Sequence, residues 1–448
     1  MKIESVFTGE SLGEIRETRV GEVAEIFKLA QSFAISRRMG ADMQPVDAFA
    51  NVGRALDAAS SEIINLLSAE TGMPVKLASE SFREFMFSLR MASYPQFVPL
   101  KEHAEEEISA YSFTRKFPAG IAVTFTSFSD PLGSLAGSLF PALKAMAPII
   151  IKPSSLAALS VLRIVKILQE SGFNNGALQA VVAKHTSNVP EHIMRDDHVT
   201  SFLCSGSPDT FRGFQEKYPL MPKMFELYSS STAIVMNSAD LDLAASAIAR
   251  SFTRFQGQSP GRIQRVIVDS RSFDYLVNRI TEELMGMVGG DPSDSATDIS
   301  KLRNRARQEE FASMASGIRG GASGILYGGG TNEGVPVPLM LEYSERWSHL
   351  WERDLMLPFI VIRRFSSDEE AMAAANSSTS TWNCFVYTDD LNDLNLLTSG
   401  LNYSRIVANS QDAHWGGGKI FSSGYTDAPF RLIAGSGLFK EKEVVVHH

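Results

Sequence analysis

Cysteine is scarce in this sequence, which has only Cys204 and Cys384 among 448 residues. Two cysteines exclude a disulfide scaffold and a zinc site built from cysteine ligands. No run of about 18 apolar residues is present, so the sequence predicts no membrane span. Long runs of lysine and arginine are also absent, and the formal net charge is -9. We therefore expect no nucleic-acid partner.

The common catalytic signatures are missing as well. The sequence contains no GxGxxG after a predicted strand, no P-loop, no HExxH and no GxSxG. Its eight histidines (His 8) show no metal-ligand spacing. The first residues, MKIESVFTGESLGEIRE, form no apolar signal region, so we expect a cytoplasmic protein. Function therefore has to be inferred from weaker motifs and from the order of the elements.

The first part of the chain is mostly helical by its apolar spacing. Apolar residues recur at helical intervals over 18–35, 45–71 and 76–93, and these segments predict helices. Segment 99–119 begins near the charged KEHAEEE and then alternates, which predicts a protruding hairpin or an edge strand. With 448 residues, 44% hydrophobic and 21% charged, the chain is expected to form two or three globular domains.

From residue 119 onward, short apolar strands alternate with amphipathic helices. This order predicts parallel sheets covered by helices on both faces, with ligands at the carboxyl ends of the strands. The predicted strands are 121–125, 147–152, 178–183, 199–204, two short runs within 225–236, 263–269, 358–365, 383–388 and 405–410. The predicted helices include 158–172, 240–256, 271–288, 367–376 and 389–400, and the glycine-rich stretch 316–330 is expected to form turns. The two αβ blocks join near residue 230.

Six weak motifs occur along the chain: IIIKPSS, FLCSGS, FELYSSSTAIVMNSADLDLA, FQGQSPGRIQRVIV, WERDLMLPFIVIRRFSSDEEAMAAANSS and IVANSQDAHWGGGKIFSSG. They follow the order of KPSE, FTGS, ELGGKSPAIV, GQxC, EEIFGP and PFGGxKxSG in the aldehyde dehydrogenase superfamily. No single match is specific, but six matches in order without large gaps are specific as a set. The sequence therefore resembles this superfamily along nearly the whole chain.

The resemblance implies an aldehyde-dehydrogenase-like α/β fold with two parallel-sheet domains and a small oligomerisation element. It assigns 1–98 and 118–228 to a nucleotide-binding α/β domain and 229–412 to the domain that is catalytic in the family. Residues 99–117 and 413–448 correspond to the oligomerisation hairpin and the C-terminal tail. The family assembles through this hairpin, so the resemblance implies a homodimer or homotetramer, with the tail strand KEKEVVV extending a partner's sheet.

Chemistry in the family depends on a cysteine thiolate that attacks the aldehyde, followed by hydride transfer to NAD(P) and hydrolysis of the thioester. In the GQxC frame this chain has Pro260, which has neither a nucleophilic atom nor a backbone N–H. The family's oxyanion asparagine corresponds to Ser129, and its general-base glutamate corresponds to Glu226. Ser259 lies beside the nucleophile position and would need Glu226 as its base.

The cofactor positions of the family are only partly kept. Lys152 corresponds to the lysine that reaches the adenosine ribose, and Ser155 replaces the glutamate that follows it. Without that carboxylate a 2′-phosphate is not repelled, so NAD and NADP both stay open as cofactors. The ribose-binding glutamate of EEIFGP corresponds to Asp354, which is one methylene shorter. Three further residues correspond to the turn that opens a helix toward the pyrophosphate: Ser205, Gly206 and Ser207.

Bulky residues occupy positions where the family has small ones. Phe211 replaces a glycine near the expected phosphates. Tyr228 and Ser229 replace the two glycines that leave room for the nicotinamide. His414 lies beside the glycine cluster that lines the family's substrate pocket, so it is a candidate pocket-lining residue.

Three functional hypotheses remain open. The first is the family's NAD(P)-dependent oxidation of a small aldehyde or acyl compound. The family's thiolate mechanism requires a cysteine at the position of Pro260. The second is a catalytically inactive member that serves as a binding or assembly subunit, with an active homologue as one conceivable partner. The third is non-thioester chemistry in the same pocket with Glu226 as base. Cys204 and Cys384 lie in predicted strands, where we expect buried, inert thiols.

Overall fold

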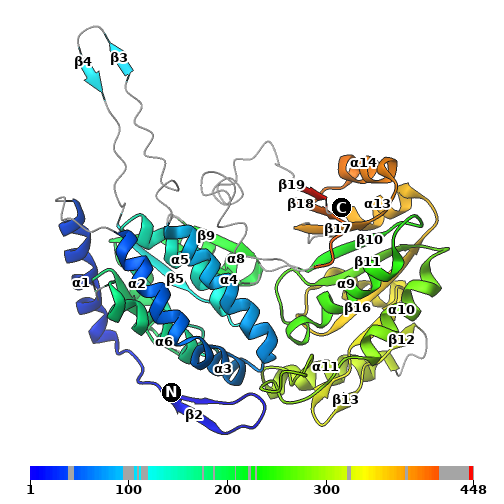
Figure 1. The fold of residues 1–448 in the computed structure, drawn as a ribbon, viewed down its shortest axis with the longest axis horizontal. Helices are drawn as coiled ribbons and strands as arrows, with labels where there is room; N and C mark the ends of the chain where they lie inside the picture. The colour runs from blue at the N-terminus through cyan, green and yellow to red at the C-terminus, as the bar shows by residue number, and fades with distance from the viewer. Residues whose placement is uncertain are drawn as a thin grey trace.

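The structure is a computed structural model, and two helix-covered sheets make up most of it (Figure 1). It describes residues 1–38, 45–93, 105–107, 110–112, 120–173, 176–184, 187–206, 208–219, 223–227, 230–319, 324–378, 382–412 and 443–446. No helix within these ranges is long and apolar enough to cross a membrane, and no group of His, Cys, Asp and Glu there could hold a metal ion. The α/β fold with parallel sheets confirms the predicted fold class.

The first sheet has five parallel strands in the order β7-β6-β5-β8-β9. They are β5 (Ile121–Phe125), β6 (Ile149–Lys152), β7 (Leu178–Ala180), β8 (Val199–Gly206) and β9 (Lys223–Leu227). Each overlaps a predicted strand, although β7 ends early, at Ala180, and β8 continues to Gly206. Because the strands are parallel, their carboxyl ends share one edge of the sheet.

Alternate residues of this sheet face two separate helical layers. Ile149 and Ile151 pack with one layer, and Ile150 packs with the other. The first layer comprises α2 (Pro45–Ala58), α3 (Ser60–Thr71), α4 (Val75–Ser93), α5 (Pro131–Lys144) and α6 (Ala158–Ser171). The second comprises α1 (Val20–Arg38), α7 (Val189–Met194) and, through Phe214, α8 (Pro208–Lys217). Burial on both faces explains the uninterrupted apolar run in β6.

The second sheet has eight strands in the order β12-β15-β16-β11-β10-β17-β18-β19. They are β10 (Ser231–Val235), β11 (Ile263–Asp269), β12 (Ile325–Tyr327), β15 (Leu339–Glu342), β16 (Phe359–Phe365), β17 (Asn383–Tyr387), β18 (Arg405–Ala408) and β19 (Glu443–Val446). Among these described strands, only β12 is antiparallel to its neighbour. The chain passes from the first sheet to the second between β9 and β10, and the domain boundaries given above remain a prediction.

Helices cover both faces of the second sheet as well. One face is covered by α9 (Leu241–Thr253) and α10 (Phe273–Met285). The other is covered by α11 (Arg305–Arg319), α12 (Ser348–Glu352), α13 (Asp368–Asn376) and α14 (Leu391–Gly400). Two short antiparallel pairs lie outside the two large sheets, in addition to the hairpin of segment 99–119: β1 (Lys2–Glu4) with β2 (Ser11–Glu14), and β13 (Thr331–Asn332) with β14 (Val335–Pro336).

Some predicted helices have different bounds in the structure. The single helix expected over 45–71 is divided into α2 and α3 at Ala59, which has φ -96° and ψ 6°. The helix expected over 240–256 ends at Thr253, because Phe255 and Gln256 both have positive φ. Neither break follows a proline or glycine, so local propensity gives no signal for it.

The glycine-rich stretch 316–330 is not made of turns alone. Helix α11 ends within it, at Arg319, and strand β12 follows before Gly328. The sequence did not predict α11 because the helix is polar, with a single narrow buried stripe formed by Phe311, Ala315 and Ile318.

The described residues of segment 99–119 form the predicted hairpin. Strands β3 (Glu105–Glu107) and β4 (Ala110–Ser112) pair in antiparallel register and stand apart from both sheets (Figure 1). The tail strand β19 pairs in parallel with β18 of the same chain, with Arg405 opposite Glu443. That this strand extends a partner's sheet stays a prediction.

A buried carboxylate on α3 holds the start of α6 in place. Glu70 accepts hydrogen bonds from the backbone N–H of Leu159 at 2.8 Å and of Ser160 at 2.9 Å, and a further one from the Ser160 hydroxyl. The two backbone donors are free N–H groups at the N-terminus of α6, which follows Lys152 at the end of β6 and the turn that carries Ser155. Glu70 therefore fixes the position of one edge of the expected nucleotide site.

Glu70 should make folding stability depend on pH. Its burial raises the pKa from 4.5 to about 7, against the effect of the hydrogen bonds that it accepts at the start of α6. The folded chain then binds a proton between these values that the unfolded chain does not, so the free energy of unfolding falls as pH rises through this window. Relative to Glu70→Gln, which cannot titrate, the wild type should lose about 3 kcal/mol between pH 4.5 and 7. Urea unfolding at a series of pH values measures this difference.

Glu62→Gln is the matched control on the same helix, because Arg163 holds the pKa of the Glu62 carboxyl below its usual value of 4.5. Its stability difference from the wild type should change only in the acid range below that window. A difference between wild type and Glu70→Gln that is the same at every pH would show that folding does not raise the pKa of Glu70.

Candidate functional site

The loop after β5 places Ser129 at the start of α5. Ser127 and Ser129 share a hydrogen bond between their hydroxyls at 2.8 Å, and the backbone N–H of Ser129 donates to the Ser127 hydroxyl at 3.0 Å. Asp130 then caps α5 by accepting from the N–H of Gly133 at 3.0 Å. Ser129 is only 6% exposed, so its hydroxyl is held inside the loop by Ser127.

The loop after α9 places Ser259 and Pro260. Phe255, Gln256 and Gly257 have φ values of 49°, 52° and 70°, three consecutive residues in the left-handed region. A Cβ on Gly257 would lie 2.3 Å from the carbonyl carbon and oxygen of Leu357, so only glycine fits there. Pro260 is buried and Ser259 is half-buried. The nucleophile position of the motif therefore lies in a tightly constrained loop.

Aromatic contacts bring these two loops together. The rings of Phe128 and Phe255 lie 5.4 Å apart between centroids, and the guanidinium of Arg303 lies over the Phe128 ring at 5.1 Å. The side-chain oxygen of Gln258 accepts from the backbone N–H of Arg303 at 3.4 Å. Ser129 on the first half of the chain and the Ser259–Pro260 loop on the second are thus neighbours at one junction. We call the Ser127–Ser129 loop, the 255–260 loop and Arg303 the junction.

Residues expected to bind the adenosine half of a cofactor lie along the carboxyl edge of the first sheet. Lys152 ends β6, with its amine 5.3 Å from the centroid of the Phe125 ring, and Ser155 is half-buried in the turn that follows. Burial lowers the pKa of the Lys152 amine, an effect that the nearby Cys204 thiol opposes. The backbone N–H of Ser154 donates to the Thr126 hydroxyl at 3.2 Å, which joins this turn to the loop after β5.

The neighbouring strands bring the remaining first-sheet positions to the same edge. Ser205 and Gly206 end β8, where they pair in parallel with Glu226 and Leu227 of β9. The register therefore places Glu226 beside the predicted pyrophosphate turn. Ser207, Tyr228 and Ser229 lie outside the described residues, as does His414. Phe211 lies in α8.

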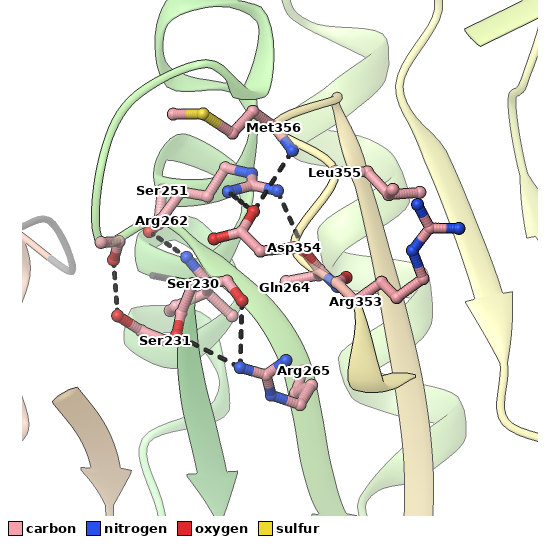
Figure 2. A network of polar contacts seen from close by, with 12 residues as sticks. Ser230, Ser231, Ser251, Arg262, Gln264, Arg265, Arg353, Asp354, Leu355 and Met356 are labelled. Carbon is pink, nitrogen blue, oxygen red and sulfur yellow. Dashed lines mark hydrogen bonds and ion pairs between the residues drawn. The ribbon is translucent and has the colours of Figure 1, made fainter. Parts of the chain in front are cut away.

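Asp354 does not join this group. It lies on the second sheet's side, where it accepts a hydrogen bond from Arg262 at 2.8 Å and another from the backbone N–H of Met356 at 3.2 Å (Figure 2). The Arg262 side chain is 0% exposed and that of Asp354 is 19% exposed. The carboxylate expected to bind a ribose is therefore engaged with a buried arginine of the same chain.

Two more polar residues of β11 complete the network around this pair. Gln264 accepts from Arg262 at 2.9 Å (Figure 2). It donates to the carbonyls of Leu350 and Arg353 at 2.9 and 2.6 Å. Arg265 is fully buried and donates to the Ser230 carbonyl and hydroxyl at 3.2 and 3.0 Å. Burial lowers the pKa of Arg265.

The sequence analysis did not select Arg262, Gln264 or Arg265. A signal for them was available, because IQRVIVD is expected to be a buried strand. Arg262 directly precedes it and Gln264 and Arg265 lie within it, and buried polar side chains need partners. The identity of those partners was not readable, since Asp354 and Leu350 lie far along the chain in a different element.

Neither cysteine can serve the junction. Cys204 lies in β8, Cys384 lies in β17, and both are buried. Burial raises the pKa of the Cys384 thiol, so it stays protonated. These findings confirm the expectation of buried thiols.

A cavity of about 1410 Å³ lies elsewhere, between α4 and α9. Its walls mix acidic and basic side chains, among them Lys76, Glu80, Arg250 and Arg254. None of the predicted site residues lines it. The junction and the first-sheet edge therefore remain the candidate site.

The Arg262–Asp354 pair should be strongly coupled in stability. Asp354→Asn keeps an acceptor for Met356 but leaves the buried guanidinium without a counter-charge, and we expect a loss of about 3 kcal/mol in the free energy of unfolding. Adding Arg262→Met removes the stranded charge, so the double variant should be more stable than Asp354→Asn alone. Urea unfolding of a double-mutant cycle measures the coupling.

The control is the Arg305–Glu309 pair of α11, which has the same separation of 2.8 Å but side chains that are 90% and 64% exposed. Its cycle should give less than about 1 kcal/mol. Equal coupling in the two cycles would contradict the role assigned to the buried pair.

Comparison with known proteins gives a consistent result. The model of the aldehyde dehydrogenase family matches residues 1–426. A 3-sulfolactaldehyde dehydrogenase from Priestia aryabhattai is 24% identical over 362 residues, covering 79% of this chain and 75% of that protein. A lactaldehyde dehydrogenase from Methanococcus maripaludis is 22% identical over 350 residues, covering 77% and 74%.

Solved structures of aldehyde dehydrogenases have a similar fold. The crystal structure of glyceraldehyde-3-phosphate dehydrogenase GapN from Methanocaldococcus jannaschii, complexed with NADP, superposes with a TM-score of 0.85 at 20% identity. The match covers 93% of this chain and 91% of that one. Since the family model spans nearly the whole sequence, the chain belongs to the aldehyde dehydrogenase family.

Proposed function

We propose that this member of a family of NAD(P)-dependent oxidoreductases binds a dinucleotide and a small aldehyde or acyl compound but does not oxidise it through a thioester. Pro260 at the nucleophile position carries this proposal, because a proline offers no thiolate and no backbone N–H for an oxyanion. The burial of both cysteines supports it, since no other thiol exists in the sequence. The protein is in this view a binding member of its family.

The first-sheet edge fits the adenosine half of NAD or NADP. Lys152 supplies an amine, and Ser155 offers a hydroxyl at the start of the turn before α6. Ser205 and Gly206 end the strand that leads into α8, a place where backbone N–H groups favour phosphate. When bound, the nucleotide would supply a hydride acceptor.

The nicotinamide half fits less well. Asp354 is engaged with Arg262 and with the backbone of Met356, so it is not free to hold a ribose in this arrangement. Ser129 is likewise bonded to Ser127. Both observations favour binding without hydride transfer.

A small aldehyde is the favoured second ligand because two proteins similar to this chain are named for 3-sulfolactaldehyde and lactaldehyde. For assembly we propose a homodimer or homotetramer, and an active homologue is a further partner to test. The hairpin of β3 and β4, which stands apart from both sheets, supports an assembly role (Figure 1). Cytoplasmic location and the domain limits stay predictions of the sequence.

Non-thioester chemistry is the second candidate function. The observation in its favour is the parallel register that sets Glu226 beside Ser205 at the carboxyl edge of the first sheet. Glutamate is a residue type that can act as a general base. Ser259, half-buried one residue before Pro260, is the hydroxyl that such a base would activate.

Calorimetric titration tests the binding proposal first. We expect NAD or NADP to bind with a dissociation constant in the micromolar range, about -8 kcal/mol. The matched variants are Lys152→Met, which should weaken binding, and Lys166→Met, an exposed lysine of α6 that should not. Absence of binding of either dinucleotide to the wild type would end the proposal.

Restoring the thiol alone should not restore oxidation. Pro260→Cys should form no NAD(P)H from aldehydes in a spectrophotometric assay, because Asp354 and Ser129 keep their internal partners. Rapid turnover by this single variant would show that those contacts are not limiting. Turnover by the wild type would instead favour the second candidate function, and Glu226→Gln should then abolish it.

A further inference from the structure

Arg303 differs from the other arginines of the region in what surrounds it. It precedes α11, its guanidinium lies over Phe128 at 5.1 Å, and its backbone N–H donates to Gln258. Phe128 is itself 6% exposed and contacts Phe255. The positive group therefore lies against the side chain that immediately precedes Ser129, at the place where the two halves of the chain meet.

The charge of Arg303 has no partner among the described residues. Its Nε is buried without a hydrogen bond, and no described carboxylate lies within ion-pair distance of its guanidinium. By contrast, Arg262 pairs with Asp354, and Arg307 pairs with Glu310. The hydroxyl of Ser300, in the same segment, is a second buried polar atom without a partner.

A buried guanidinium without a counter-charge lowers the stability of the folded protein. Burial lowers the pKa of Arg303 to about 10, and the charge on Arg307 acts in the same direction while Glu310 opposes it. Desolvation of an ion is compensated only by an opposite charge or by hydrogen bonds, and here the Phe128 ring face supplies only a weak substitute. A bound anion would remove this imbalance.

We propose that Arg303 binds an acidic group of the small-molecule ligand, of the carboxylate, phosphate or sulfonate class. The guanidinium fork matches two oxygens of such a group, and the aromatic face holds the fork in one plane. This inference rests on the proposed function, because it needs a small ligand at the junction. It adds the chemical class of that ligand, an aldehyde or acyl compound that carries a negative charge.

The anion could also come from the nucleotide. The contacts of Arg303 favour the small ligand, because they are with Phe128 beside Ser129 and with Gln258 beside Ser259. Those are the loops that hold the oxyanion and nucleophile positions. The residues that fit the adenosine half lie instead at the ends of β6 and β8.

The test compares two probes that differ in one phosphate, glyceraldehyde 3-phosphate and glyceraldehyde, by calorimetric titration of the full chain. We expect the wild type to bind the phosphorylated probe at least about tenfold more tightly. Arg303→Met keeps a flexible side chain over Phe128 and should remove this preference, while Arg303→Lys should retain part of it. Arg305→Met, an exposed arginine two residues further on, should leave it unchanged.

The outcomes separate the two proposals. Equal affinity of the wild type for both probes would overturn the inference while leaving dinucleotide binding intact. An equal loss of affinity for both probes in Arg303→Met would also overturn it, since that pattern indicates a structural role. A loss of dinucleotide affinity in Arg303→Met, without any preference between the probes, would overturn the assignment to the small ligand and place the anion on the nucleotide. A phosphate preference without dinucleotide binding would support Arg303 and contradict the proposed function.

Discussion

The buried ion pair between Arg262 and Asp354 is the interaction on which the geometry of the junction depends. Arg262 follows the constrained loop that contains Pro260, and Asp354 lies in the segment before β16 (Figure 2). The close approach of Gly257 to the backbone of Leu357 joins the same two segments a second time. Separating the two segments would leave the buried guanidinium of Arg262 without its only carboxylate partner among the described residues, so movement of one segment alone is costly.

This constraint has a chemical consequence. In the family's sequence frame, the position of Asp354 belongs to the cofactor and the position of Pro260 to the nucleophile. Here the first is used to neutralise Arg262 and the second is a rigid residue without a reactive atom. The two positions lie close together, because Arg262 stands only two residues after Pro260 and donates a hydrogen bond to Asp354 at 2.8 Å. The position without a thiol therefore lies next to a carboxylate that is engaged within the chain.

Much of the fold was predictable because its strands are buried on both faces. Runs such as IIIK and IQRVIVD are too apolar and too short for surface helices, and the structure confirms both as parallel strands. The break at Ala59 and the polar helix α11 were not predictable, since neither carries a proline, a glycine or a wide apolar stripe at the decisive place. Motif order located Pro260 and Asp354, but the Arg262–Asp354 contact joins different elements, and single-sequence spacing cannot reveal such a pair.

The distribution of charge at the junction favours binding over reaction. Arg262 has Asp354, Arg307 has Glu310, and Arg265 has only neutral oxygens among its described hydrogen-bond partners. With Arg303 unpaired within the described ranges, positive groups outnumber carboxylates around the two loops. Without a nucleophile, polarising a substrate carbonyl leads to no reaction. The positive charges of these arginines still stabilise a bound anion. Under the proposed function, electrostatics suited to a charged ligand can therefore persist at a position that holds a proline in place of a nucleophile.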